Sequence, residues 1–124
     1  MSGPRIAAAA VLGLRIAYGA ALLVAPGSVT KRWLGPAGQR PAAQVGLRGL
    51  GAREIVIHTG GLIAAVGGGP VRPWLAASIA GDLSDIAATT AARKGVPDDA
   101  PLLTALVAGG SAALSAAVGA AVDA

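Results

Sequence analysis

Four apolar stretches of roughly 20 residues each constrain this chain more than any other feature of its sequence. They run from about residue 6 to 25, 47 to 66, 71 to 92 and 101 to 122, and segments rich in proline and glycine separate them. A helix of about 20 residues is long enough to cross the hydrocarbon core of a bilayer. The pattern predicts an all-α protein, in which residues 1–124 form a single membrane domain, a four-helix transmembrane bundle.

The composition favours lipid over water as the surroundings of these helices. The mean hydropathy is +0.66 and 54% of the residues are hydrophobic, yet the chain contains no Phe and only 2% aromatic residues. Helices rich in Ala and Val bury little area in water, whereas in a membrane small residues let backbones approach one another. A soluble alanine-rich bundle is the alternative, and it would partition into buffer rather than detergent.

The absence of Cys and the scattered positions of the basic residues argue against several classes of function. The chain has no Cys, which excludes disulfides, thiolate metal sites and a cysteine nucleophile. The net charge of +4 comes from basic residues scattered along the chain, several of them inside apolar runs, so nucleic-acid binding is not expected. Heavy use of Ala, Gly, Arg and Val is typical of a high-GC bacterium, and the bacterial inner membrane is the expected location.

The loops at 27–46 and 93–100 contain five of the basic residues that lie outside the middle of the apolar stretches. These are Lys31, Arg32, Arg40, Arg93 and Lys94, whereas the opposite side has only Arg5 and Arg72. The positive-inside rule therefore predicts a multi-pass protein with both loops in the cytoplasm and both termini outside.

The first stretch has an alternative interpretation as a cleaved signal peptide, because Arg5 precedes an apolar run. Arg15 in the middle of that run, together with its length, favours a membrane helix. After it, Ser28 is a candidate N-cap for a short helix at the headgroup level that includes Trp33. From Gly35 to about Val45 the chain is expected to be irregular.

Away from their ends, three of the apolar stretches contain ionisable residues, at depths where a membrane tolerates them least. They are Arg15 in the first, Arg53, Glu54 and His58 in the second, and Asp82 and Asp85 in the third. Each charge at the bilayer centre costs roughly 2.5 to 3.5 kcal/mol on insertion scales. Unpaired, these residues would oppose insertion of the chain.

Helical spacing predicts that these residues meet. Ser78, Asp82, Asp85 and Thr89 are spaced by four, three and four residues and line one stripe of a helix. Glu54 and His58 are four residues apart and share a face of the neighbouring helix. We expect Arg15 and Arg53 to pair with Glu54, Asp82 and Asp85 inside the bundle, with His58 beside them.

Two interpretations of this cluster stay open. Buried pairs can simply fix helix register in an accessory subunit or scaffold, whose small-residue faces bind partner membrane helices or a second copy of the chain. Intramembrane ionisable residues also mark functional sites. In that case the cluster binds a small, partly apolar ligand: the arginines hold an anionic or carbonyl group, and His58 exchanges protons with a carboxylate. No motif indicates a catalytic residue or a cofactor.

A metal site is a narrower alternative. Glu-x-x-x-His and Asp-x-x-Asp on adjacent helices supply one imidazole and three carboxylates, which is a ligand set for a divalent ion. Two arginines in the same place would repel such an ion, so no metal is expected.

Four segments together resemble a known family. They are Leu-Arg-Ile-Ala-Tyr-Gly at 14–19, Leu-Leu-Val-Ala-Pro at 22–26, Leu-Arg-Gly-Leu-Gly-Ala-Arg-Glu at 47–54 and Ala-Gly-Asp-Leu-Ser-Asp at 80–85. The pattern resembles small four-helix membrane proteins of the DUF4267 type, which are similar in layout to the DoxX-like group. The resemblance implies four membrane helices. It implies little about function, because the DUF4267 type is uncharacterised, and it carries over no catalytic residue.

Overall fold

Five α-helices and two short 3-10 segments form the fold over residues 1–122, which are the residues that the computed structural model describes. The long helices are α1 (Gly3–Val24), α3 (Pro41–Gly67), α4 (Arg72–Ala91) and α5 (Ala100–Ala121). The short helix α2 (Pro26–Leu34) and η1 (Gly35–Gln39) connect α1 to α3, and η2 (Arg93–Gly95) lies between α4 and α5. The predicted all-α class is confirmed, and a long helix occupies each apolar stretch.

Proline marks the start of every α-helix. It occupies one of the first two helical positions in α1, α2, α3, α4 and α5. Its fixed φ angle suits the first helical turn, and its missing N–H would have no intrahelical partner there. At the other end of α3, Gly68 adopts a left-handed conformation with a φ of 78°, which ends the helix.

Two predictions about the first connection are wrong. The chain is not irregular up to Val45, because Pro41 begins α3 several residues before the expected start. Ser28 is not an N-cap, because α2 already begins at Pro26 and its N-cap residue is Ala25. The helix-starting role of proline explains both differences.

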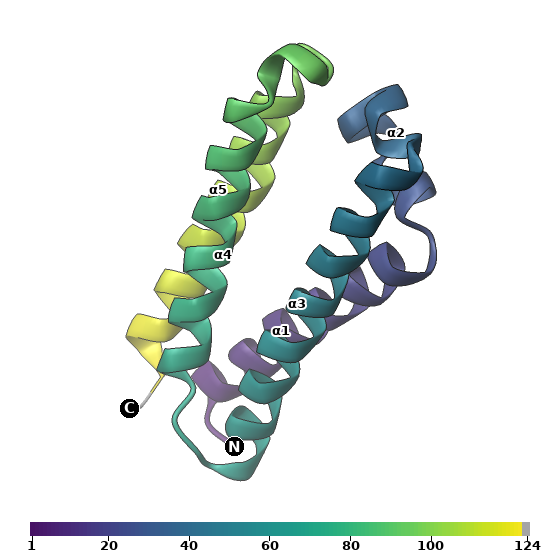
Figure 1. The fold of residues 1–124 in the computed structure, drawn as a ribbon. Helices are drawn as coiled ribbons and strands as arrows, with labels where there is room; N and C mark the ends of the chain where they lie inside the picture. The colour runs from purple at the N-terminus through teal and green to yellow at the C-terminus, as the bar shows by residue number, and fades with distance from the viewer. Residues whose placement is uncertain (123–124) are drawn as a thin grey trace.

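The four long helices form two pairs. Helix α1 packs mainly against α3, and α4 packs mainly against α5. In Figure 1 the pairs meet near the two termini and the α3–α4 connection, and they diverge toward the end that contains α2 and the α4–α5 connection. The two basic loops predicted to share one side therefore do lie at the same end of the fold.

Apolar packing holds the pairs together where they meet. A core cluster of buried side chains there includes Leu12, Ala65, Val71, Leu75 and Val118, contributed by all four long helices and the α3–α4 connection. No comparable apolar cluster is found toward the diverging end among residues 1–122. The ionisable residues lie farther along the helices, toward the diverging end.

Two of the helices, α1 and α5, are long and apolar enough to cross a membrane. Only 22% and 17% of their apolar windows are buried, whereas the core helix of a soluble protein would be mostly covered. Helices α3 and α4 do not meet the same criterion, because their ionisable residues lower their mean hydropathy.

Glycines let α1 and α3 cross at close range. A Cβ atom on Gly51 would lie 2.6 Å from the Gly19 carbonyl oxygen, and one on Gly19 would lie 2.7 Å from the Gly51 carbonyl oxygen. Both distances are far below van der Waals contact, and both partners are backbone atoms. The crossing therefore requires glycine on each helix.

We predict that Gly51→Ala lowers the stability of the protein by roughly 1 to 3 kcal/mol, because the added methyl group forces the two backbones apart. The measurement is thermal unfolding in detergent, followed by tryptophan fluorescence. Gly46→Ala is the matched control in the same helix, because a Cβ atom there meets nothing within 4 Å. Equal unfolding temperatures for the two variants would contradict the close crossing.

Candidate functional site

Arg15 joins all four long helices through its guanidinium group. Its Nε and Nη2 atoms donate to the two Glu54 carboxylate oxygens of α3, at 2.8 and 2.9 Å. Its Nη1 and Nη2 atoms donate to the two Asp82 oxygens of α4, at 3.1 and 2.7 Å. Nη1 also donates to the Ser111 hydroxyl of α5. The predicted pairing of Arg15 with Glu54 and Asp82 is confirmed.

These contacts use the whole donor capacity of Arg15. A guanidinium has five N–H groups, and the hydrogen bonds to Glu54, Asp82 and Ser111 engage all of them. The side chains of Glu54 and Asp82 retain only 2% and 3% of their exposure. The role predicted for an arginine, holding an anionic or carbonyl group of a ligand, is therefore not open to Arg15 in this conformation.

Arg53 forms a second pair toward the diverging end. Its Nη1 and Nη2 atoms donate to the two Asp85 oxygens at 3.1 and 3.0 Å, and Nη2 also donates to Glu54 Oε1 at 3.2 Å. The guanidinium packs over Gly81, where a Cβ atom would lie 3.2 Å from Cζ. Glu54 thus connects the Arg15 and Arg53 pairs, and the predicted pairing of Arg53 with Asp85 is also confirmed.

His58 lies beside the cluster with both ring nitrogens in hydrogen-bonding contact. Its Nδ1 is 2.6 Å from the Glu54 carbonyl oxygen and 3.2 Å from Glu54 Oε2. Both partners are acceptors, so Nδ1 carries the proton of the neutral ring. Nε2 is 2.7 Å from the Ser78 hydroxyl and accepts its hydrogen bond. His58 therefore connects α3 to α4, as Arg15 and Arg53 do.

The three carboxylates lie close enough together to suggest a cation site. One oxygen from each of Glu54, Asp82 and Asp85 lies within 4.8 Å of the others. Every carboxylate oxygen of the three, however, accepts a hydrogen bond from Arg15 or Arg53. The two guanidinium groups occupy the positions that a metal ion would need.

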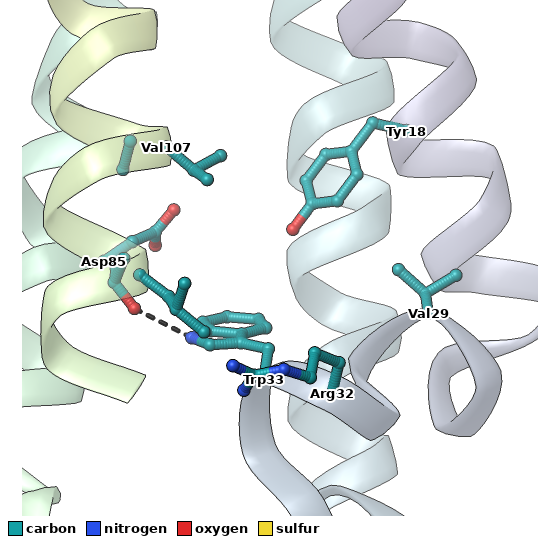
Figure 2. A pocket seen from close by; sticks show the side chains of 9 residues that line it. Tyr18, Val29, Arg32, Trp33, Asp85 and Val107 are labelled. Carbon is teal, nitrogen blue, oxygen red and sulfur yellow. Dashed lines mark hydrogen bonds between the residues drawn. The ribbon is translucent and has the colours of Figure 1, made fainter. Parts of the chain in front are cut away.

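A pocket of about 260 Å³ lies between the helix pairs at the diverging end. Its walls are mainly apolar and include Val29 of α2 and Leu103 and Val107 of α5. Figure 2 shows the Tyr18 hydroxyl and the Asp85 carboxylate pointing into this space from opposite helix pairs. The pocket thus combines apolar walls with two polar groups that face each other.

Asp85 connects this pocket to the buried cluster. Among the described residues that line the pocket, Asp85 is the one that the sequence analysis predicted as a site residue. Its side chain retains 23% of its exposure, many times the value for Glu54 or Asp82. The predicted site residues therefore divide into a buried part around Arg15 and His58 and a partly exposed Arg53–Asp85 pair, of which Asp85 lines the pocket.

Helix α2 lines the pocket and contacts the opposite helix pair. The indole Nε1 of Trp33 donates to the Thr104 hydroxyl of α5 at 2.8 Å. Arg32 donates to Asp99, before α5, with the shortest contact at 2.7 Å. This hydrogen bond lowers the pKa of the Asp99 carboxyl, so the pair is stabilising above the usual aspartate pKa and is lost as the pH falls through the lowered pKa. Both side chains are solvent-exposed, so this pair is weak.

Several residues of the site were not predicted from the sequence. Tyr18 lies three residues after Arg15, so the two side chains share a face of the helix, and this spacing could have indicated that Tyr18 belongs to the site. Trp33 was expected at the headgroup level, and no sequence pattern indicated its bond to Thr104. Ser111 accepts a hydrogen bond from Arg15, and no sequence pattern indicated this contact.

Arg5 was expected only as an orienting charge outside the membrane. It is buried and donates to the carbonyl oxygens of Ala64, Ala65 and Gly69 at the end of α3, at 3.1, 3.0 and 2.7 Å. Arg72 likewise donates to the Gly119 and Val122 carbonyl oxygens at the end of α5. Each arginine donates to carbonyl oxygens at the end of a neighbouring helix, and so ties the two helices of its pair together.

Comparison of the chain with protein-family models, curated proteins and solved structures gave no match. The resemblance to DUF4267-type proteins therefore stays a prediction, and the function is inferred from the geometry of the site.

We predict that Arg15→Met lowers the stability of the protein by about 3 to 5 kcal/mol, because it leaves Asp82 buried without a cation and Glu54 with only its contact to Arg53. Thermal unfolding and folded yield in detergent measure this effect. Adding Glu54→Gln and Asp82→Asn to Arg15→Met removes the uncompensated charges and should restore part of the loss. Lys94→Met, at an exposed cation, is the control. A loss no larger than that of the control would refute the structural role of Arg15.

Proposed function

We propose that this chain is an integral membrane protein with four spanning helices, and that it binds a small, partly apolar molecule between its two helix pairs. The observation that carries the proposal is the pocket at the diverging end, which has mainly apolar walls and the Asp85 carboxylate at its inner side. Small-molecule sites commonly combine apolar walls with a few polar groups in defined positions. The pocket is slightly smaller than the usual range of about 300 to 1,000 Å³, which favours a small ligand.

Two features support a membrane location for all four long helices, and a third supports its orientation. Each has at least one large apolar side chain on its outer surface: Leu14 on α1, Ile63 on α3, Leu83 on α4 and Leu106 on α5, all at least 56% exposed. In the middle of α3 and α4, Arg53, Glu54, Asp82 and Asp85 are paired inside the bundle, which reduces the cost of placing them in lipid. Basic loops at the diverging end support a cytoplasmic position for that end, where the pocket opens.

An accessory or scaffold role is the second candidate, and one observation favours it. The five N–H groups of Arg15 are all used within the protein, so this part of the cluster serves to hold the helices in register. In our proposal the two roles are divided: the Arg15 contacts position the helix pairs, and Asp85 faces the ligand. Asp85 serves both roles, because it pairs with Arg53 and also lines the pocket.

The membrane location predicts how the chain fractionates. Expressed in bacteria, it should stay with the membrane fraction through a high-salt wash and be released by detergent, because the exposed apolar faces of its helices are solvated by lipid. Recovery of a monodisperse protein from buffer without detergent would contradict this and favour the soluble bundle.

Ligand binding can be measured with Trp33, which lines the pocket. In a Trp74→Phe background it is the single tryptophan of the chain. We predict that medium-chain alkyl compounds with a terminal bromine quench its fluorescence in a saturable manner. Ala108→Phe fills the pocket and should abolish the saturable part, whereas Ala105→Phe, at an exposed position on the same helix, should leave it intact.

Quenching that never saturates, or that is the same in the two α5 variants, would mean that the probes only dissolve in the surrounding detergent. The binding proposal would then fail and the scaffold role would stand. Both variants are compared at equal folded yield, so that a loss of structure is not mistaken for a loss of binding.

A further inference from the structure

Tyr18 and Asp85 present complementary hydrogen-bonding groups to the pocket. Tyr18 comes from α1 and Asp85 from α4, so the two groups belong to opposite helix pairs, and in Figure 2 they face each other across the open space. Tyr18 is 39% exposed, and its hydroxyl has no hydrogen-bond partner within residues 1–122. A hydroxyl both donates and accepts, so Tyr18 has both capacities available.

Asp85 has acceptor capacity left after its pairing with Arg53. Each of its oxygens accepts one N–H from that guanidinium, at 3.1 and 3.0 Å. An ionised carboxylate offers about four lone-pair positions, so about two remain. Asp85 is thus able to accept a hydrogen bond from a ligand without giving up its ion pair.

The charge of the cluster disfavours an anionic ligand. Two cations, Arg15 and Arg53, stand against three carboxylates, Glu54, Asp82 and Asp85, so the formal charge is −1 with His58 neutral. At the mouth of the pocket, Arg32 is already paired with Asp99. An anion entering the pocket would therefore meet the Asp85 carboxylate, and Arg32, the one guanidinium group among the described residues that line the pocket, would have to leave Asp99 to receive it. The Nε atom of Arg53 has no hydrogen-bond partner, but it is buried and Arg53 does not line the pocket.

We infer that the ligand is an amphiphile whose polar head is a hydroxyl group, which donates a hydrogen bond to Asp85 and accepts one from Tyr18. Its apolar part lies against Val29, Leu103 and Val107. This inference rests on the proposed ligand-binding function and adds the chemical class of the ligand. It differs from the expectation that arginines hold an anionic or carbonyl group of the ligand. Here the Asp85 carboxylate accepts a hydrogen bond from the ligand hydroxyl, and the Tyr18 phenol donates one to it.

Three brominated probes with the same alkyl chain test the inference: a primary alcohol, its methyl ether, and the corresponding carboxylate. Each is titrated at neutral pH against the single-tryptophan protein, with Trp33 quenching as the signal. The ether keeps the shape and the acceptor of the alcohol but cannot donate, and the carboxylate is ionised at this pH. We expect the alcohol to bind about threefold to tenfold more tightly than the ether, which is the value of one hydrogen bond, and the carboxylate to bind most weakly.

Two variants assign the effect to the named residues. Tyr18→Phe keeps the ring and removes the hydroxyl, and it should weaken binding of the alcohol about threefold to tenfold. Asp85→Asn removes the negative charge and adds an N–H donor, so the difference in affinity between the alcohol probe and the carboxylate probe should become smaller. Tyr18→Phe removes no hydrogen bond within residues 1–122, so the variant should fold, and its affinity for the probes can be measured even if Asp85→Asn fails to fold.

The results separate this inference from the proposed function. If the ether or the carboxylate binds as tightly as the alcohol, and Ala108→Phe still abolishes binding, the pocket stands and the hydroxyl preference is overturned. Unchanged affinity of Tyr18→Phe for the alcohol also overturns it. If no probe distinguishes Ala108→Phe from Ala105→Phe, the proposed function itself fails.

Discussion

The fold depends on one guanidinium group placed between four helices. Arg15 is in α1, and its hydrogen bonds reach Glu54 in α3, Asp82 in α4 and Ser111 in α5. In lipid, each of these charges alone would cost roughly 2.5 to 3.5 kcal/mol, so each strongly favours the arrangement in which it is paired. Because a guanidinium is planar and has a fixed set of donors, two bidentate carboxylates also fix the orientation of the helices that present them. Helices this rich in Ala and Gly have few large side chains to specify their register by packing.

The pocket follows from where this contact lies. Apolar packing joins the helix pairs near the termini, and the Arg15 contacts join them farther along. Beyond these contacts the pairs diverge, and α2 spans the space between them through Trp33 and Arg32. The ionic cluster contributes one residue to the pocket, the Asp85 carboxylate. One set of residues therefore serves both the assembly of the helices and the proposed recognition of a ligand.

Much of the ionic cluster could be predicted from the sequence, because helical spacing and the cost of charge in lipid left few possible partners among the ionisable residues. Spacings of three and four placed Asp82 and Asp85 on one stripe, and the cost of charge in lipid required partners, of which Arg15 and Arg53 were the suitable cations. The pocket could not be predicted in this way. It depends on the angle between the helix pairs and on the position of α2, which are set by tertiary contacts such as Gly19 against Gly51 and Trp33 against Thr104. The contacts of Arg5 were missed because counting charges does not reveal which carbonyl oxygens an arginine side chain reaches in the fold.

The most direct test of the account is a distance measurement between the helix pairs in lipid vesicles. The chain has no Cys, so spin labels can be attached at Val45→Cys on α3 and Leu102→Cys on α5, both on exposed positions near the diverging end. With Arg15 present, pulsed electron paramagnetic resonance should give one narrow distance distribution. In the Arg15→Met variant the distribution should broaden, while Lys94→Met leaves it unchanged. A distribution that is equally narrow without Arg15 would contradict the claim that this residue sets the arrangement of the two pairs.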